Sequence, residues 1–599
     1  MASFLVPLVA GWATSRLTTP PPQALGLGVP WPALGAAFFL SLVPLAGVLP
    51  KITPEGVDLS APVFDHAKIA LIDEIARFGL PPNNPFFGGA GEPSRLAYYY
   101  LWHFSAAEIA WVFGIGGWTA DAALTGFTAF SSLSLMMGIA AFLARRSTAA
   151  ILVLPIAASG SAKSLLVAAF GVAAVDRVLS AYPGLAGWLL QATWVPQHLA
   201  AATSAVIATL LIPQLKGPTG WLAAVLLALV TFVGFGCSTW VGGIVFGFAA
   251  PLVGLLVLVA STPGERPTVL ARALLAFVLS LALSLPLIHD QIVATAHRGG
   301  EFPVALHAYE VLGPLVPDWG RRLLDLPSFW LILLPLTFPA ISIPAVAGFR
   351  LAINERDGPE PQRRLMLVAL IVLALAGLAT SGFLVSTIGN NDLGWRAVLP
   401  AVLVGSAAAA SAVVCLLRRS SWLAAIATAA ATLLGLPDAA RTAVANMAGQ
   451  HTTAAQDFAN MPALWEAVRQ IAHPEDRVAN NPLLLQQVLP WPVNAGWALL
   501  ARQRSCFAGW EVARAYAPLS RQRVTEIDAH FIRVFAGTAS LSETRALATS
   551  FGCTLMIVTP TDGAWERDGF AQAGGFQVVQ ETERWRIYRA EHSKLVDRR

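Results

Sequence analysis

An acidic residue and a histidine stand side by side at Asp65 and His66, in a polar stretch that follows the first long apolar segment. A carboxylate in this place could act as a general base that takes a proton from a hydroxyl group. It could instead bind a divalent cation such as Mg²⁺ or Mn²⁺ together with the imidazole of His66. The third interpretation is structural, with Asp65 capping a helix and His66 pointing to water. The residues alone leave these three interpretations open.

The residues that follow have the period of a helix. Phe64, Lys68 and Ile72 fall on one face, and Gly79 predicts the end of the helix. Asp65 lies near the first turn, where exposed amide donors favour a negative charge. We therefore expect a short helix that presents its acid near the N-terminal end.

Composition divides the chain into two classes of protein. Of 599 residues, 56% are apolar and 12% are charged, whereas a soluble domain carries about 25% charged residues. This deficit excludes a single soluble enzyme, a disordered chain and a secreted disulfide scaffold. Residues 451–599 hold 31 charged residues, and the other 450 residues hold 43. A net charge of +4 without a basic run gives no support to a nucleic-acid partner.

Apolar stretches long enough to cross a bilayer recur along the first 440 residues. The fold class we predict is an α-helical polytopic membrane protein of about eleven transmembrane helices, followed by a soluble α/β domain. The expected spans are 31–50, 119–143, 147–160, 197–214, 220–236, 239–260, 268–288, 327–349, 365–387, 396–417 and 421–437.

The distribution of Lys and Arg predicts the orientation. With the N-terminus in the cytoplasm, the basic loops fall on the inner side, provided that the aromatic segment 96–116 lies at the membrane surface. In the alternative, this segment crosses the membrane, and the orientation of all later helices in the membrane is reversed. We expect a multi-pass protein of the bacterial inner membrane. Residues 1–445 would form the transmembrane domain with a large outer loop (51–118), and 446–599 a periplasmic domain.

The C-terminal part reads as an α/β domain. A helix is expected at 463–471, a buried strand near 553–560, and a closing hairpin at 575–588. We interpret it as an accessory domain that covers the membrane cavity or holds an acceptor, or that serves stability alone. Cys506 and Cys553 could pair as a disulfide in an oxidising compartment, or remain buried thiols.

Two strings carry a resemblance to a known family. Gly79–Gly89 reads Gly-Leu-Pro-Pro-Asn-Asn-Pro-Phe-Phe-Gly-Gly, and Tyr98–His103 reads Tyr-Tyr-Tyr-Leu-Trp-His. Together with the layout of the spans, they resemble the GT-C superfamily of membrane glycosyltransferases and its YYY-motif group. The resemblance implies a sugar donor linked to a polyprenyl phosphate and a first-loop acid, Asp65, that activates the acceptor. Many members carry paired acids here, whereas Asp65 is followed by His66 and preceded by Asp58.

By the same resemblance, cations would hold the leaving lipid phosphate. Arg396 opens a span on the outer side and could bind phosphate oxygens, or anchor the span at the interface beside Trp395. His198 could donate to phosphate or cap its helix. Arg298 precedes two glycines and could belong to a loop that closes over the lipid, or to a solvated loop. The tyrosines could stack on sugar or isoprene, or form an interfacial belt.

The predicted function is transfer of a hexose or pentose to a glycan, lipid or protein acceptor at the periplasmic face, with membrane lipid as the surrounding partner. A divalent metal is the only cofactor considered. A transporter or flippase, or a non-catalytic envelope protein, would be the alternative on the same scaffold. The enzyme requires that Asp65, His198 and Arg396 share one cavity. The remaining candidates for that cavity are Asp58, Lys68, Tyr99, His103, Asn391 and Asp392.

Overall fold

The computed structural model describes most of the chain, in two compact units. The described residues are 29–49, 51–53, 56–58, 67–88, 95–179, 184–298, 302–306, 309–354, 360–388, 392–449, 462–484 and 496–591. The helical unit comprises residues 1–45, 124–286 and 304–447, and the mixed unit comprises 46–123, 287–303 and 448–599. The segment 51–118, which was predicted to be the first outer loop, therefore belongs to the same unit as the C-terminal domain.

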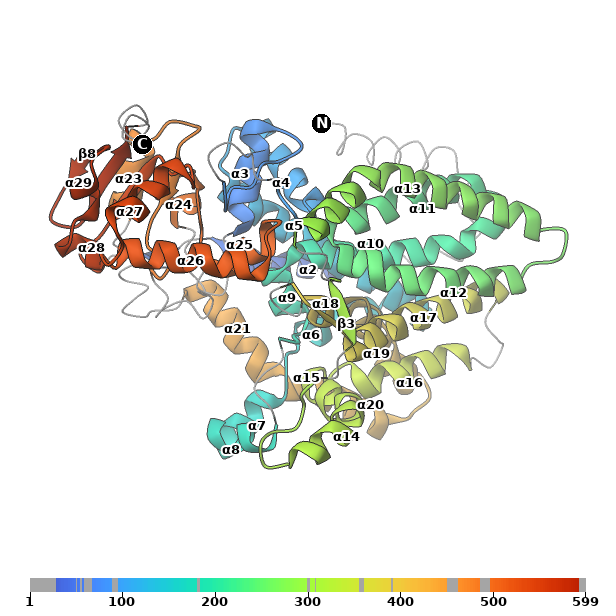
Figure 1. Cartoon of the computed structure of the whole chain (residues 1–599). Helices are drawn as coiled ribbons and strands as arrows, with labels where there is room; N and C mark the ends of the chain where they lie inside the picture. The colour runs from blue at the N-terminus through green and yellow to red at the C-terminus, as the bar shows by residue number, and fades with distance from the viewer. Residues whose placement is uncertain are drawn as a thin grey trace. The chain divides into compact units, whose positions relative to one another are not determined.

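Long apolar helices dominate the described residues (Figure 1). Nine of these are long and apolar enough to cross a membrane, and two bent helix pairs raise the number to eleven. The predicted fold class, a many-helix chain with a C-terminal α/β domain, is thereby confirmed. The helices in or near these spans are α2 (Trp31–Val48), α5 (Gly117–Ala144), α6 (Ala149–Ala158), α7 (Lys163–Phe170), α8 (Val172–Val178), α9 (Trp188–Trp194), α10 (Pro196–Leu211), η1 (Ile212–Lys216), α11 (Gly220–Cys237), η2 (Thr239–Val245), α12 (Phe246–Val259), α13 (Arg266–His297), α14 (Asp318–Ser328), η3 (Phe329–Leu333), α15 (Leu334–Thr337), α16 (Ser342–Ile353), α17 (Pro361–Phe383), α18 (Asp392–Arg396), α19 (Leu399–Arg418), α20 (Trp422–Leu434) and α21 (Leu436–Ala448).

Basic side chains join successive helix ends at one end of the helical unit. Arg363, at the start of α17, donates to the carbonyl of Leu143 at the end of α5, at 2.9 Å. Arg272 of α13 donates to Leu215 O at 2.7 Å. Lys216 donates to the carbonyl of Ala260, directly after α12, at 2.8 Å. Each of these bonds joins helix ends that the basic pattern assigns to the same side of the membrane.

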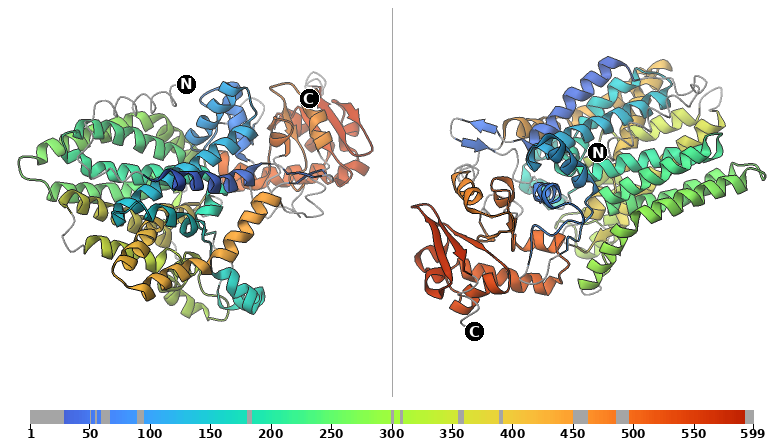
Figure 2. Two further views of the ribbon diagram at one scale, coloured as in Figure 1. Left: turned by 180° about the vertical axis from the view of Figure 1, so that it is seen from behind. Right: turned by 90° about the horizontal axis from the view of Figure 1, so that it is seen from above.

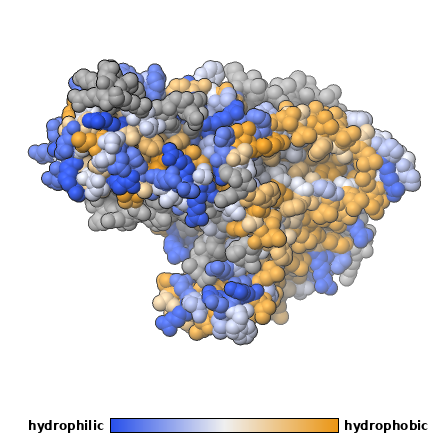
Figure 3. All heavy atoms as spheres, in the orientation of Figure 1, coloured by the Kyte–Doolittle hydropathy of each residue, from blue (hydrophilic) through white to orange (hydrophobic). Residues whose placement is uncertain are grey.

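The surface of the helical unit is apolar where the long helices lie (Figure 3). On α13, Leu274 and Phe277 are 62% and 63% exposed, and Leu270 and Val278 are more than half exposed. Such a face is unfavourable in water and is typical of contact with lipid tails. A two-stranded pairing of β3 (Val304–Leu306) with β4 (Leu384–Ser386) completes the described part of this unit.

The mixed unit contains a five-stranded sheet in the order β6-β5-β7-β9-β8, with β5 parallel to β6 and β7. The hairpin of β8 and β9 was expected from the sequence. Cys506 and Cys553 form a disulfide, which confirms the pairing that the sequence offered as a hypothesis. The strands are β5 (Arg477–Ala479), β6 (Arg504–Ser505), β7 (Leu555–Val558), β8 (Phe576–Glu581) and β9 (Arg586–Ala590); the helices are α23 (Pro462–Ile471), α24 (Gly496–Leu499), α25 (Trp510–Tyr516), α26 (Arg521–Phe535), α27 (Leu541–Thr549), α28 (Gly563–Glu566) and α29 (Gly569–Ala573).

The first outer loop contributes its own elements to this unit. A small antiparallel pair, β1 (Lys51–Thr53) and β2 (Gly56–Asp58), is visible in Figure 2, and α3 (Ala67–Phe78) packs against α4 (Leu101–Phe113). Leu71 of α3 and Phe86 lie in one hydrophobic core with Trp465 and Trp497 of the C-terminal part. Burial of these large apolar side chains stabilises the loop and the α/β domain together. The loop is thus part of a folded unit and does not stand alone.

Candidate functional site

The residues at the centre of the predicted chemistry, Asp65 and His66, lie outside the described residues, as does Asn391. Asp58 ends β2 and is paired in register with Lys51. The expectation that Asp65 shares a cavity with His198 and Arg396 therefore stays a prediction. The other candidate residues lie in the described part, and several of them surround Lys68 in the mixed unit or Arg396 in the helical unit.

The first cluster surrounds Lys68 in the first turn of α3. Its ammonium lies 3.5 Å from the carboxylate of Asp121 in α5, and the two side chains are 3% and 1% exposed. It also lies 5.8 Å from the ring centroid of Trp102. A buried ammonium requires such a counter-charge, because an isolated buried charge is strongly destabilising. Sequence analysis missed Asp121, although an acid inside an apolar helix is itself a signal.

His103 lies beside this ion pair and is 1% exposed. Among the described residues, neither of its ring nitrogens has a hydrogen-bond partner. Burial, with a smaller contribution from the charge of Lys68, lowers the pKa of His103 to about 3. The imidazole is therefore neutral near pH 7, with one nitrogen able to accept a proton or hydrogen bond. The described residues contain no group of three metal-ligating side chains.

The tyrosine triplet is packed inside the mixed unit. Tyr98 stacks on Tyr99 with ring centroids 3.9 Å apart and contacts Tyr516 at 4.6 Å. Tyr99 is 4% exposed, so the interpretation of this residue as part of an interfacial belt is wrong. The exposed aromatic side chains lie instead at the end of α4, at Trp111 and Phe113. The α4 helix is not among the candidate spans, as the expected threading requires.

The Pro-Asn-Asn-Pro string of the first loop lies along the edge of the five-stranded sheet. The carbonyl of Pro85 accepts from Ser505 N at 2.8 Å, and the carbonyl of Phe86 accepts from Ala508 N at 2.9 Å. Asn84 donates through its side chain to Tyr516 O at 2.9 Å. A Cβ atom at Gly88 would collide with the guanidinium of Arg477, which explains the glycine. This string therefore attaches the loop to the α/β domain.

A buried ion pair reinforces this attachment. Arg504 donates to both carboxylate oxygens of Glu74, at 2.6 Å each, and the two side chains are 12% and 1% exposed. The two parallel bonds match the planar fork of arginine. Because the charges of Arg504 and Glu74 neutralise each other, we assign this pair the structural role of holding α3 against the sheet.

The second cluster surrounds Arg396 in the helical unit. Arg396 is 1% exposed, which contradicts its interpretation as an anchor at the lipid interface. Its guanidinium donates to Gln191 Oε1 at 2.9 Å and to Asp392 Oδ1 at 3.3 Å. The guanidinium carbon lies 4.3 Å from the ring centroid of Trp194. Its Nε atom and the amide nitrogen of Gln191 have no hydrogen-bond partner among the described residues.

The other two predicted cations are placed differently. His198, in the first turn of α10, is 1% exposed, and its Nδ1 lies 2.8 Å from the hydroxyl of Ser238. Arg298 belongs to the mixed unit, where it is 5% exposed and donates to Ala515 O at 3.1 Å. Burial lowers the pKa of Arg298 to about 10. Arg298 is therefore buried, contrary to its interpretation as part of a solvated loop.

Two comparisons of sequence find relatives of this chain. Residues 454–589 match the family model described as "Y4nK C-terminal Rossmann-like domain". A protein of Sinorhizobium fredii (strain NBRC 101917 / NGR234), named "Uncharacterized protein y4nK", is 32% identical over 570 residues, which is 92% of this chain and 84% of that protein.

Among solved structures, the chain is similar to the oligosaccharyltransferase AglB of the archaeon Archaeoglobus fulgidus in complex with an inhibitory peptide and a dolichol-phosphate. The identity is 11% and the TM-score 0.44, over 94% of this chain and 74% of that one. A structure of the Archaeoglobus fulgidus oligosaccharyltransferase with zinc and sulfate gives 11% identity and a TM-score of 0.48, over 88% and 68%. The extent and level of identity with the Sinorhizobium protein place this chain in the y4nK family.

Proposed function

We propose that this protein is a membrane glycosyltransferase that moves a sugar from a polyprenyl-phosphate donor to a hydroxyl acceptor. The observation that carries the proposal is the surroundings of Arg396. A fully buried guanidinium retains a donor that has no partner among the described residues, while the carboxylate that it pairs with, Asp392, is 33% exposed. A phosphate oxygen would satisfy that donor, because arginine binds phosphate through its N–H groups.

In the proposed reaction, an acceptor hydroxyl oxygen attacks the anomeric carbon of the donor sugar. The bond from that carbon to the phosphate oxygen breaks, and the lipid phosphate leaves with the electron pair. Asp65 takes the hydroxyl proton as general base. Arg396, aligned by Gln191, stabilises the negative charge that grows on the phosphate. His198 would add a further donor at the outer start of α10. A divalent metal at Asp65 and His66 would bind the phosphate as well.

Asp65 belongs to the mixed unit and Arg396 to the helical unit. Asp65 is two residues before the start of α3, whose Lys68 is neutralised by Asp121. Lys68 is therefore a counter-charge for the fold rather than for the substrate.

We further propose that the mixed unit faces the periplasm. The helix ends joined by Arg363, Arg272 and Lys216 would then lie in the cytoplasm, as the positive-inside rule requires. The Cys506–Cys553 disulfide fits an oxidising compartment, whereas Cys237 and Cys415 of the helical unit are free thiols.

The proposal is tested with the Asp65→Asn variant in membrane vesicles supplied with a panel of polyprenyl-phosphate sugars. Transfer should be lost, while expression and melting temperature stay near those of the wild type, because the amide keeps the shape of the side chain and cannot accept the proton. Glu583→Gln, in the exposed turn before β9, is the matched control and should retain full activity. Full activity of Asp65→Asn would contradict the assignment.

A further inference from the structure

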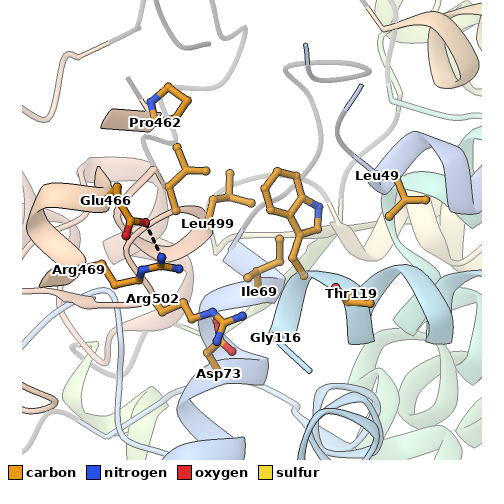
Figure 4. Close-up of a pocket in the computed structure, with 12 residues that line it drawn as sticks. Leu49, Ile69, Asp73, Gly116, Thr119, Pro462, Glu466, Arg469, Leu499 and Arg502 are labelled. Atoms are coloured by element: carbon orange, nitrogen blue, oxygen red, sulfur yellow. Dashed lines mark ion pairs between the residues drawn. The ribbon is translucent and has the colours of Figure 1, made fainter. Parts of the chain in front are cut away.

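A cavity lined by charged and apolar side chains lies wholly within the mixed unit (Figure 4). It has a volume of about 410 Å³, which is in the range of small-molecule sites. Its walls come from α3, the start of α5, and the helices α23 and α24. None of the residues used above for sugar transfer lines it.

The polar wall contains equal numbers of acids and cations. Asp73 lies beside Arg502 in the cavity wall, and Glu466 and Arg469, one turn apart on α23, form an ion pair at 2.5 Å. The net formal charge of these four groups is zero. A wall of this kind offers many donors and acceptors without selecting for an anion or a cation.

Asp73 is positioned with one oxygen engaged and one available. Its Oδ1 accepts from the backbone N–H of Gly117 at 2.9 Å, and its other oxygen makes no hydrogen bond among the described residues. Burial raises the pKa of Asp73, and the guanidinium groups of Arg502 and Arg77 oppose that shift. The carboxylate is thus fixed in orientation while it keeps an acceptor for a ligand.

Arg502 is held in a strained conformation. Its φ is +54°, in the left-handed region that residues other than glycine seldom adopt. The carbonyl of Arg502 accepts from Arg77 at 2.6 Å. A Cβ atom at Gly116 would collide with the Arg502 guanidinium, so the glycine makes room for that side chain. Strain of this kind is concentrated at functional sites.

The opposite wall is apolar and aromatic. Ile69, Leu499 and Leu500 line it together with Trp118. The indole N–H of Trp118 donates to Val48 O at 2.6 Å, which holds the ring in place. A rigid indole provides a flat apolar face, and such a face packs well against the C–H side of a sugar ring.

We infer that this cavity binds a neutral saccharide unit. The carboxylate of Asp73 and the guanidinium of Arg502 would bond to neighbouring hydroxyl groups of the sugar, and Trp118 would cover one face of its ring. A phosphate would meet two carboxylates and an ammonium ion would meet two guanidinium groups, so the charge balance favours an uncharged polyhydroxyl ligand. The further assignment of this sugar as part of the acceptor rests on the proposed function.

The binding test uses the full-length protein in lipid nanodiscs without any lipid-linked donor. Methyl glycosides of glucose, mannose, galactose and N-acetylglucosamine are the probes, and saturation-transfer NMR is the readout. At least one glycoside should bind, and Asp73→Asn, Arg502→Gln or Trp118→Ala should weaken it about tenfold or more. Glu583→Gln and Arg584→Gln, both in an exposed turn, are the matched controls and should bind as the wild type.

Three results would overturn the inference: no glycoside binds the wild type, the three pocket variants bind as well as the wild type, or a phosphatidylethanolamine headgroup displaces the glycoside. The role as acceptor is tested separately in transfer assays. Asp73→Asn should raise the half-saturating concentration of the acceptor and leave that of the donor unchanged, and an unchanged acceptor value would exclude the role. Because binding is measured without transfer, failure of the saccharide site and failure of the proposed enzyme give different results.

Discussion

Two buried cations of this protein are compensated in different ways. Lys68 in the mixed unit faces a carboxylate, Asp121, that is 1% exposed. Arg396 in the helical unit faces Asp392, which is 33% exposed, and its other partners are the neutral Gln191 and the ring of Trp194. The first charge is neutralised inside the protein, and the second is compensated only in part.

This difference separates a structural ion pair from a candidate ligand site. A charge that is paired at close range in the interior has little left to offer a substrate. The guanidinium of Arg396 pairs with a partly exposed carboxylate and keeps one N–H donor that has no partner among the described residues, and its orientation is set before a ligand arrives. The comparison therefore assigns stability to Lys68 and donor binding to Arg396, and three experiments test these assignments.

The largest effect is expected for Asp121→Ala. This variant leaves the ammonium of Lys68 buried without a counter-charge, which should destabilise the protein by about 3–5 kcal/mol. Thermal unfolding of the purified protein measures the loss. The double variant Lys68→Met, Asp121→Leu should recover most of the lost stability, because two apolar residues replace both charges.

Asp318→Ala, at an exposed pair with Arg321, is the control and should change stability by less than about 1 kcal/mol. An Asp121→Ala protein as stable as the wild type would contradict the structural role of the pair.

A smaller effect, on donor binding, is expected for Arg396→Gln. Loss of a charged donor to phosphate should raise the half-saturating concentration of the lipid donor about tenfold to a hundredfold. The half-saturating concentration for Arg396→Lys should lie between those of the wild type and Arg396→Gln, because lysine keeps the charge and lacks the planar guanidinium. Arg418→Gln, at the C-terminal end of α19 and exposed, is the matched control. An unchanged donor titration in Arg396→Gln would remove this residue from the site.

The smallest effect is a pH dependence at His103, next to Lys68. The folded protein keeps this imidazole neutral down to about pH 3, whereas an unfolded chain protonates it below about pH 6.5. The contribution of the neutral imidazole to the free energy of unfolding is therefore fully present above pH 6.5 and decreases as the pH falls towards 3. At pH 5 the decrease is about 2 kcal/mol. Melting temperatures between pH 4.5 and 7.5 should fall less steeply for His103→Leu than for the wild type. Equal slopes for the two proteins would show that His103 takes up its proton in the folded state.

Much of the architecture is readable from local pattern. The long apolar helices were predicted from runs of apolar residues, and the β8–β9 hairpin from alternation around a turn, because hydropathy and turn preference act over a few residues. The pairing of Cys506 with Cys553 could be predicted from the sequence, because they are the two cysteines of the charged C-terminal part. The sequence could also have indicated Asp121, because it is an acidic residue within an apolar helix.

The partners of the candidate site were not readable in this way. Nothing near Arg396 in the sequence indicates Gln191, which lies 205 residues away, and nothing near Asn84 indicates Tyr516, 432 residues away. The different roles of Lys68 in stability and of Arg396 in donor binding depend on which side chains the fold brings within a few ångströms of each. The sequence by itself determined the helices, the α/β domain and the candidate residue types, because these follow from local chemistry. Only the tertiary structure decided that the first loop and the C-terminal domain share a core, because contacts between distant segments depend on how the whole chain packs.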